Sequence, residues 1–129
     1  MKYIIDTQIL IWQISGNTRI HSDTIGIITN ADNEVYVSWA SIWEITVKAS
    51  IGKLFLGISL SELEKYLNQN GYKILDFNFR YFDVLKTLNY FHRDPFDRLI
   101  ISQAIAEALT LITSDDKMEQ YDVKLILNK

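Results

Sequence analysis

Four acidic residues lie where the chain passes from one expected element of secondary structure to the next, and carboxylates in such positions could hold a divalent cation. Asp6 and Asp115 follow short apolar runs that are typical of strands, whereas Glu44 and Asp97 fall in the first turn of expected helices. Carboxylate oxygens are the ligands preferred by Mg²⁺ and Mn²⁺. If the four acids converge, they predict a metal site that could support phosphodiester chemistry.

Each acid also has a purely structural interpretation. Asp6 is a favoured N-cap for the helix expected after it. Residues 41–44 (Ser-Ile-Trp-Glu) have the pattern of a capping box, in which Glu44 would reach back to the backbone of the cap residue. The same pattern occurs at residues 59–62 (Ser-Leu-Ser-Glu), where we expect no chemistry. Local sequence leaves both interpretations open for Asp6 and Glu44.

The other two acids raise the same question. Asp94 is the expected N-cap of a helix with Pro95 in its first position, which makes Asp97 the third helical residue. An acid near the positive end of a helix contributes about 0.3–1 kcal/mol at an exposed site. One acid would be enough to stabilise the start of this helix, so the second, Asp97, is compatible with a metal ligand. Asp115 could cap a short helix that begins at Lys117.

The order of the expected elements would bring the four acids together. Strands alternate with helices, which predicts a parallel sheet with helices on both faces. Ligands of such sheets bind beyond the carboxyl ends of the strands, where Asp6 and Asp115 fall and near which the helices bearing Glu44 and Asp97 begin. The strands are expected at residues 3–6, 34–38, 72–76, 109–113 and 123–127, and the helices at 7–14, 18–30, 41–50, 59–70, 78–89, 95–108 and 117–121.

Convergence of these acids would require a counter-charge. Two carboxylates about 4 Å apart repel each other by about 4 kcal/mol at an effective dielectric constant near 20. Three or four would therefore bind protons or a cation. The chain has no cysteine, and its two histidines, His21 and His92, lack the spacing of paired ligands. A lone histidine is more often a surface or core residue than a ligand, so we expect Mg²⁺ or Mn²⁺ and not zinc.

Composition limits the class of protein. A chain of 129 residues fits one domain, 1–129, with enough apolar content for a core. The net charge of −3 argues against tight, charge-driven binding of nucleic acid by the whole surface. The apolar runs are too short to cross a bilayer, and Asp6 interrupts the stretch that a signal peptide would need. We therefore expect a soluble cytoplasmic protein.

Four stretches carry distinctive residue patterns: residues 5–7, 37–45 with Lys48 and 52–54, 92–104, and 111–115. The most specific patterns are Trp-Glu-Ile at 43–45 with Lys48 and Gly-Lys-Leu at 52–54, and Arg-Asp-Pro-Phe-Asp-Arg at 93–98. Over nearly the whole chain, these stretches resemble the PIN-domain family and, within it, the VapC-type ribonuclease toxins of type II toxin–antitoxin systems.

The resemblance implies a fold and a function. The fold would be a single three-layer α/β/α PIN-like domain with a parallel sheet. The function would be that of an Mg²⁺- or Mn²⁺-dependent endoribonuclease that is inhibited by a cognate antitoxin and forms a homodimer. The catalytic and metal-binding acids of the family map onto Asp6, Glu44, Asp97 and Asp115. Asp94 would be an additional acid beside them.

This chain departs from the resemblance at two positions. Gln8 replaces a histidine that is usual in close relatives, and Ser114 stands where a basic residue is often seen. Other side chains could contact RNA, although each basic one has solvent exposure as its simpler interpretation. The basic candidates are Lys48, Lys53, Arg93 and Arg98, and the aromatic ones are Trp12, Trp39 and Trp43.

Two other functions are weaker alternatives. A receiver-like phosphoacceptor would need an acidic neighbour beside Asp6 and a lysine at the end of a late strand, but the nearest candidate, Lys117, is misplaced. A catalytically silent PIN-like binding module would keep the fold without turnover. All four acids are present, so the sequence gives no reason to prefer that alternative.

Overall fold

The sheet that was expected from the sequence is present in the computed structural model, which describes residues 1–128; Lys129, the last residue of the predicted domain, lies outside them. Its five strands are all parallel, in the order β3-β2-β1-β4-β5. They are β1 (Lys2–Ile5), β2 (Glu34–Ser38), β3 (Lys73–Leu75), β4 (Thr110–Thr113) and β5 (Leu125–Leu127).

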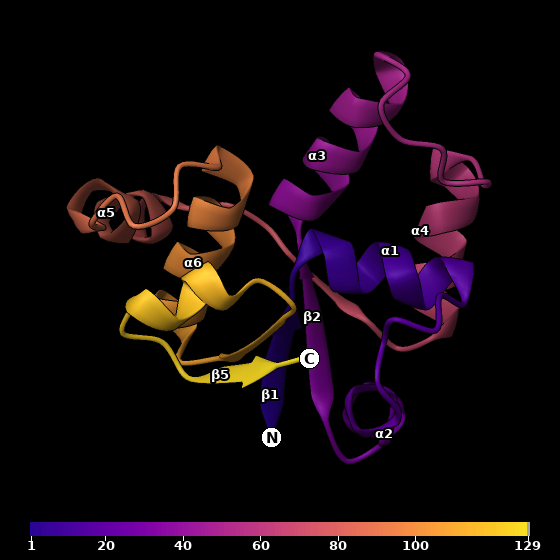
Figure 1. Ribbon diagram of the computed structural model, residues 1–129, viewed down its shortest axis with the longest axis horizontal. Helices are drawn as coiled ribbons and strands as arrows, with labels where there is room; N and C mark the ends of the chain where they lie inside the picture. Colours follow the sequence, from indigo (N-terminus) through magenta and orange to yellow (C-terminus); the bar gives the residue numbers. More distant parts are fainter. Residues whose placement is uncertain (129) are drawn as a thin grey trace.

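Helices cover both faces of the sheet (Figure 1). They are α1 (Thr7–Ser15), α2 (Ser22–Thr29), α3 (Trp39–Ser50), α4 (Leu60–Gln69), α5 (Phe79–Thr87), α6 (Pro95–Glu107) and the 3₁₀ helix η1 (Asp116–Gln120). In Figure 1, α1 to α4 lie on one side of the central strands, and α5 and α6 lie on the other.

Alternation along the strands builds a separate core on each face, because successive side chains of a strand point to opposite sides. Ile5 and Ile112 pack in the core that includes α1, α2, α3 and α4. Ile4 and Leu111 pack in the core that includes α6. All four side chains are fully buried. The predicted three-layer α/β/α fold is confirmed.

The first strand lies at the centre of the sheet, between β2 and β4. Ile5 pairs with Val37 on one side and with Ile112 on the other. The backbone N–H of Asp6 extends this ladder by donating to the carbonyl of Ile112 at 3.1 Å. The strand order therefore brings Asp6 next to the residues that follow β4.

Two helices begin two or more residues away from their expected starts. The helix expected at 18–30 begins at Ser22, because the Asn17 side chain accepts from the N–H of Arg19 (2.9 Å) and forms a turn before it. The helix expected at 41–50 begins at Trp39, since the hydroxyl of Ser38 accepts from Ala40 N–H and caps it. The capping box predicted for residues 41–44 is therefore wrong, whereas the one at 59–62 is present. Among residues 1–128, no helix combines the length and apolar character that a membrane span requires.

Candidate active site

The four predicted acids line one cavity at the carboxyl edge of the sheet. The cavity has a volume of about 280 Å³, which leaves room for a cation with several waters. Its walls come from the ends of β1 and β4, from α1 and α3, and from the start of α6. The lining residues are Asp6, Thr7, Gln8, Ile11, Glu44, Lys48, Asp94, Asp97, Ser114 and Asp115.

Asp6 has both a structural role and a place in the cavity. Its Oδ1 accepts from the N–H of Ile9 at 2.9 Å and caps α1, so the capping interpretation holds. Its Oδ2 accepts a hydrogen bond from the hydroxyl of Thr113. Burial raises the pKa of Asp6 to about 6 despite these two bonds, and the charges of Asp115 and Glu44 add to the rise. Burial and the neighbouring acids therefore favour the protonated form of Asp6, and a bound cation would favour the ionised form.

Glu44 lies in the second turn of α3 because this helix begins at Trp39, so its predicted position in the first turn is wrong. Its side chain is buried, and Oε2 pairs with the ammonium of Lys48 one turn later. This hydrogen bond raises the pKa of Lys48. Among residues 1–128, the buried Oε1 of Glu44 has no hydrogen-bond partner. Such an atom costs about 1–3 kcal/mol unless a ligand satisfies it.

The start of α6 places two acids beside Glu44. Asp94 is the N-cap, and its Oδ1 accepts from the N–H groups of Phe96 (2.9 Å) and Asp97 (3.0 Å). Asp97 is the third helical residue, as predicted. Burial raises the pKa of Asp97 to about 8, and the charges of the neighbouring acids, Asp94 first, contribute to the rise. Oxygen atoms of Glu44, Asp94 and Asp97 lie within 4.8 Å of one another.

His92 also lies in this site, although it was not predicted as a site residue. The Nε2 atom of His92 lies 2.8 Å from Oδ2 of Asp115 and 3.2 Å from Oδ2 of Asp97. Asp115 also caps η1 through Oδ1, which accepts from the N–H of Lys117. His92 precedes Asp115 by 23 residues, so no local pattern signals the contact. The sequence offered only an indirect signal, since His92 opens the stretch 92–104 two residues before the Asp94 cap.

The donor set fits a hard divalent cation. The cavity offers carboxylate oxygens, including the unpartnered Oε1 of Glu44. Burial and the charges of neighbouring acids raise the pKa values of Asp6 and Asp97, so a bound cation would favour the ionised form of both. Asp97 belongs to both groups of potential ligands within residues 1–128, one with Glu44 and Asp94 and one with His92 and Asp115, whereas Asp6 lines the cavity outside these groups. Asp97 is thus the central acid.

The basic and aromatic candidates fall in different environments. Arg98 is only 5% exposed, so the side chain neither contacts RNA nor faces solvent, and both interpretations offered for it are wrong. Lys53 and Arg93 are exposed, and Lys48 pairs with Glu44 at the cavity. Trp12 is half-buried against the core, whereas Trp39 and Trp43 are partly exposed.

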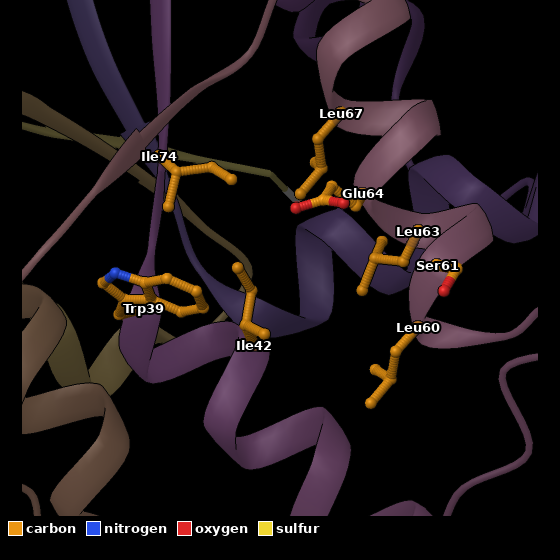
Figure 2. A pocket seen from close by; sticks show the side chains of 8 residues that line it. All are labelled: Trp39, Ile42, Leu60, Ser61, Leu63, Glu64, Leu67 and Ile74. Carbon is orange, nitrogen blue, oxygen red and sulfur yellow. The ribbon is translucent and has the colours of Figure 1, made fainter.

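A second hollow lies between α3 and α4 and is apolar (Figure 2). Figure 2 shows Ile42 of α3 and Leu63 and Leu67 of α4 directed into the space between the two helices. This groove has a volume of about 280 Å³ and is lined by Trp39, Ile42, Leu60, Ser61, Leu63, Glu64, Leu67 and Ile74. Its lining suits an apolar binding partner and not acid–base chemistry.

The fold and the acidic cavity define a three-layer α/β/α protein with a candidate metal centre. The family model of the PIN domain matches residues 3–124, and the chain belongs to the PIN domain family. The resemblance to this family is thereby confirmed. No curated protein matches the chain.

Solved structures share the fold over almost the whole chain. VapBC2 from Rickettsia felis, bound to a DNA fragment from its promoter, has 23% identity over 98% of both chains and a TM-score of 0.74. VapBC-1 from nontypeable Haemophilus influenzae has 20% identity over 98% of both chains and a TM-score of 0.70. A toxin–antitoxin complex from Klebsiella pneumoniae has 16% identity over 98% of both chains and a TM-score of 0.66.

Proposed function

We propose that the protein is a metal-dependent endoribonuclease, the cytoplasmic toxin component of a type II toxin–antitoxin system. The observation that carries the proposal is the convergence of Asp6, Glu44, Asp97 and Asp115 on one cavity in a PIN-domain protein. The likeness to VapBC structures supports the toxin assignment.

The four acids would hold Mg²⁺ or Mn²⁺ and act catalytically through it. When bound, the cation would lower the pKa of a water and offset charge on the phosphoryl oxygens of RNA. The buried Oε1 of Glu44 is free to accept a ligand bond, and Lys48 neutralises the other oxygen of the same carboxylate. An acid of the set that does not contact the cation would orient the attacking water by a hydrogen bond.

Cleavage of RNA tests this proposal directly. Wild type would cut RNA in the presence of Mg²⁺ or Mn²⁺, and Asp6→Asn and Asp97→Asn would lose cleavage at least a hundredfold, as expected for groups that act on the transition state. Asp122→Asn changes an exposed acid outside the cavity and is the matched control. Equal cleavage by wild type and both site variants would contradict the proposal. Cation binding without cleavage of RNA would indicate a catalytically silent binding module.

The apolar groove between α3 and α4 supports a protein partner. A cognate antitoxin would lay an amphipathic segment into this groove, with apolar residues against Leu63 and Leu67 (Figure 2). Leu60 is 49% exposed at its edge, so Leu60→Glu should weaken binding without disturbing the core. Binding is measured by co-purification of wild type or Leu60→Glu with the product of an adjacent reading frame. Phe55→Glu, which alters an exposed apolar residue outside the groove, is the control.

A second exposed apolar surface supports a homodimer. Trp43 of α3 is 52% exposed and Phe82 of α5 is 43% exposed, and both line a hollow of about 710 Å³. Side chains of this size in one exposed patch are typical of protein interfaces. Light scattering would give twice the chain mass for wild type and the monomer mass for Trp43→Glu. A monomeric wild type would contradict the homodimer alone and leave the nuclease proposal untouched.

A further inference from the structure

His92 lies between two of the proposed metal-binding acids without facing solvent. Its side chain is 10% exposed, and Nε2 lies 2.8 Å from Asp115 and 3.2 Å from Asp97. A ring nitrogen in this position could act in two ways. It could donate a hydrogen bond to the carboxylates, or it could present a lone pair to the same cation.

The other ring nitrogen distinguishes these two roles. Nδ1 of His92 lies 3.1 Å from the backbone nitrogen of Asp94, whose N–H can only donate. Nδ1 must therefore carry the lone pair, and the proton of the neutral ring is on Nε2, directed at the carboxylates. A histidine that ligates a metal through Nε2 has the opposite arrangement, with its proton on Nδ1. In this arrangement, Nε2 is a donor and not a ligand.

A buried arginine holds the segment that carries His92. Nη1 of Arg98 donates to the carbonyls of Asn89 (2.8 Å) and His92 (3.3 Å), and Nη2 donates to that of Leu88 (3.4 Å). The guanidinium also lies 3.8 Å from the ring centre of Tyr90. Within residues 1–128, Arg98 forms no salt bridge. A buried charge is costly without such hydrogen bonds, so its contacts fix residues 88–92.

Tyr121 completes this support from the other end of the chain. Its hydroxyl accepts from the N–H of His92 at 2.9 Å and donates to the carbonyl of Asn89 at 2.8 Å. Both backbone polar groups of His92 are therefore bonded, one to Tyr121 and one to Arg98. This network fixes the ring with Nε2 facing Asp115 and Asp97.

We infer that His92 is a positioning residue of the proposed nuclease site. Its Nε2–H donates to Oδ2 of Asp115, and Nε2 lies 3.2 Å from Oδ2 of Asp97, so the ring sets the direction in which both carboxylates face the cavity. Each of these two oxygens keeps a further lone pair for a cation. The inference rests on the proposed function, because it assigns His92 a task at the same metal site.

Nuclear magnetic resonance of the imidazole nitrogens tests the geometry without an activity assay. The chain has only two histidines, and His21→Gln leaves His92 as the single signal. We expect the Nε2–H tautomer in the metal-free protein and the same tautomer after Mg²⁺ is added. An Nδ1–H tautomer in the metal-free protein would overturn the inference. A change to that tautomer when Mg²⁺ binds would also overturn it, because it would show that His92 is a ligand.

Substitutions test the consequence for metal binding. His92→Leu removes the donor and should weaken Mn²⁺ binding about 10- to 100-fold, the range found for residues that orient metal ligands. His92→Gln can place an amide N–H near the position of Nε2 and should recover most of the affinity. His21→Gln is the matched control, because His21 is exposed and does not line the acidic cavity.

The outcomes separate the inference from the proposed function. Calorimetric titration with Mn²⁺ is done on variants whose thermal unfolding shows that they are folded. Unchanged affinity in folded His92→Leu, or equal losses in His92→Leu and His92→Gln, would refute the positioning role while leaving a metal-binding nuclease. A wild type that neither binds Mn²⁺ nor cuts RNA would instead remove the proposed function, whatever the tautomer.

Discussion

The hydroxyl of Thr113 donates a hydrogen bond to Oδ2 of Asp6, although the two residues are 107 positions apart in the chain. The same hydroxyl accepts from the backbone N–H of Asp115 at 3.0 Å. Thr113 ends β4 and Asp6 follows β1, and these two strands are neighbours in the sheet. One fully buried threonine thus links the first and the last of the proposed catalytic acids.

Replacement of Thr113 by valine should harm both stability and metal binding. Thr113→Val removes the hydroxyl that donates to the buried Oδ2 of Asp6. It also removes the acceptor of the backbone N–H of Asp115. Loss of such partners costs about 1–3 kcal/mol in the free energy of unfolding. Thr113→Ser keeps the hydroxyl and should bind Mn²⁺ more tightly than Thr113→Val. Chemical denaturation and calorimetric titration measure the two effects, and equal Mn²⁺ affinity in both variants would contradict the role given to the hydroxyl.

The metal-free protein should lose stability as pH rises from about 5 to about 8. The folded-state pKa values of Asp6 (about 6) and Asp97 (about 8) exceed the ordinary value of 3.8, so the folded state binds more protons in this range. Each unit of pKa difference corresponds to about 1.4 kcal/mol, so the ionisation of Asp6 alone lowers the free energy of unfolding by about 3 kcal/mol. Thermal unfolding in a chelator measures this slope. Excess Mg²⁺ should abolish this dependence of stability on pH. The same slope with and without Mg²⁺ would contradict the metal site.

Cation binding should release protons. Asp97, with a pKa of about 8 in the metal-free protein, must lose its proton before it can ligate. Below about pH 8, the affinity for Mn²⁺ should therefore increase about tenfold for each unit by which the pH rises. Calorimetric titration in buffers of different ionisation enthalpy counts the protons released. Binding that is independent of both pH and buffer would contradict the expected loss of a proton from Asp97 on ligation.

Asp97→Asn should have opposite effects on stability and on function. The amide removes a carboxylate whose pKa is raised by burial and by Asp94, so the metal-free variant should be more stable than wild type at about pH 8, on the order of 2 kcal/mol. This gain should shrink near pH 5, where Asp97 of the wild type is already protonated. The same variant should lose Mg²⁺-dependent cleavage. Denaturation at the two pH values provides the test, with Asp122→Asn as the control.

Arg98 should tolerate no replacement by lysine. The planar guanidinium reaches the carbonyls of Leu88, Asn89 and His92 at once, whereas an ammonium would leave a buried charge with fewer partners. Arg98→Lys should cost about 2–4 kcal/mol and weaken Mn²⁺ binding through the displaced His92. Arg93→Lys, at an exposed position, should change stability by less than about 0.5 kcal/mol. Similar losses of stability in Arg98→Lys and Arg93→Lys would contradict the supporting role given to Arg98.

Features of the site that depend on neighbouring residues were predictable from sequence. Pro95 and the Asp94 cap fix the start of α6, so the place of Asp97 as third helical residue follows from local chemistry. The start of α3 was not predictable in this way, because Ser38 and Ser41 are both favoured N-caps. Strand β2 ends at Ser38 and the helix follows directly, which places Glu44 one turn further in than expected.

Features that depend on distant contacts were not predictable. His92 meets Asp115 only because the strand order and the Arg98 contacts bring its segment to the end of β4. Arg98 occupies the buried face of α6, and nothing in its neighbourhood in sequence distinguishes a buried cation from an exposed one. The three-layer fold was predictable because it follows from the order of strands and helices, which many residues specify together.

The central place of β1 has a consequence for the order in which the acidic cavity assembles during translation. The first strand leaves the ribosome before β4, one of its two partners, which is synthesised more than a hundred residues later. Asp6 meets Thr113 and Asp115 only after that stretch has emerged.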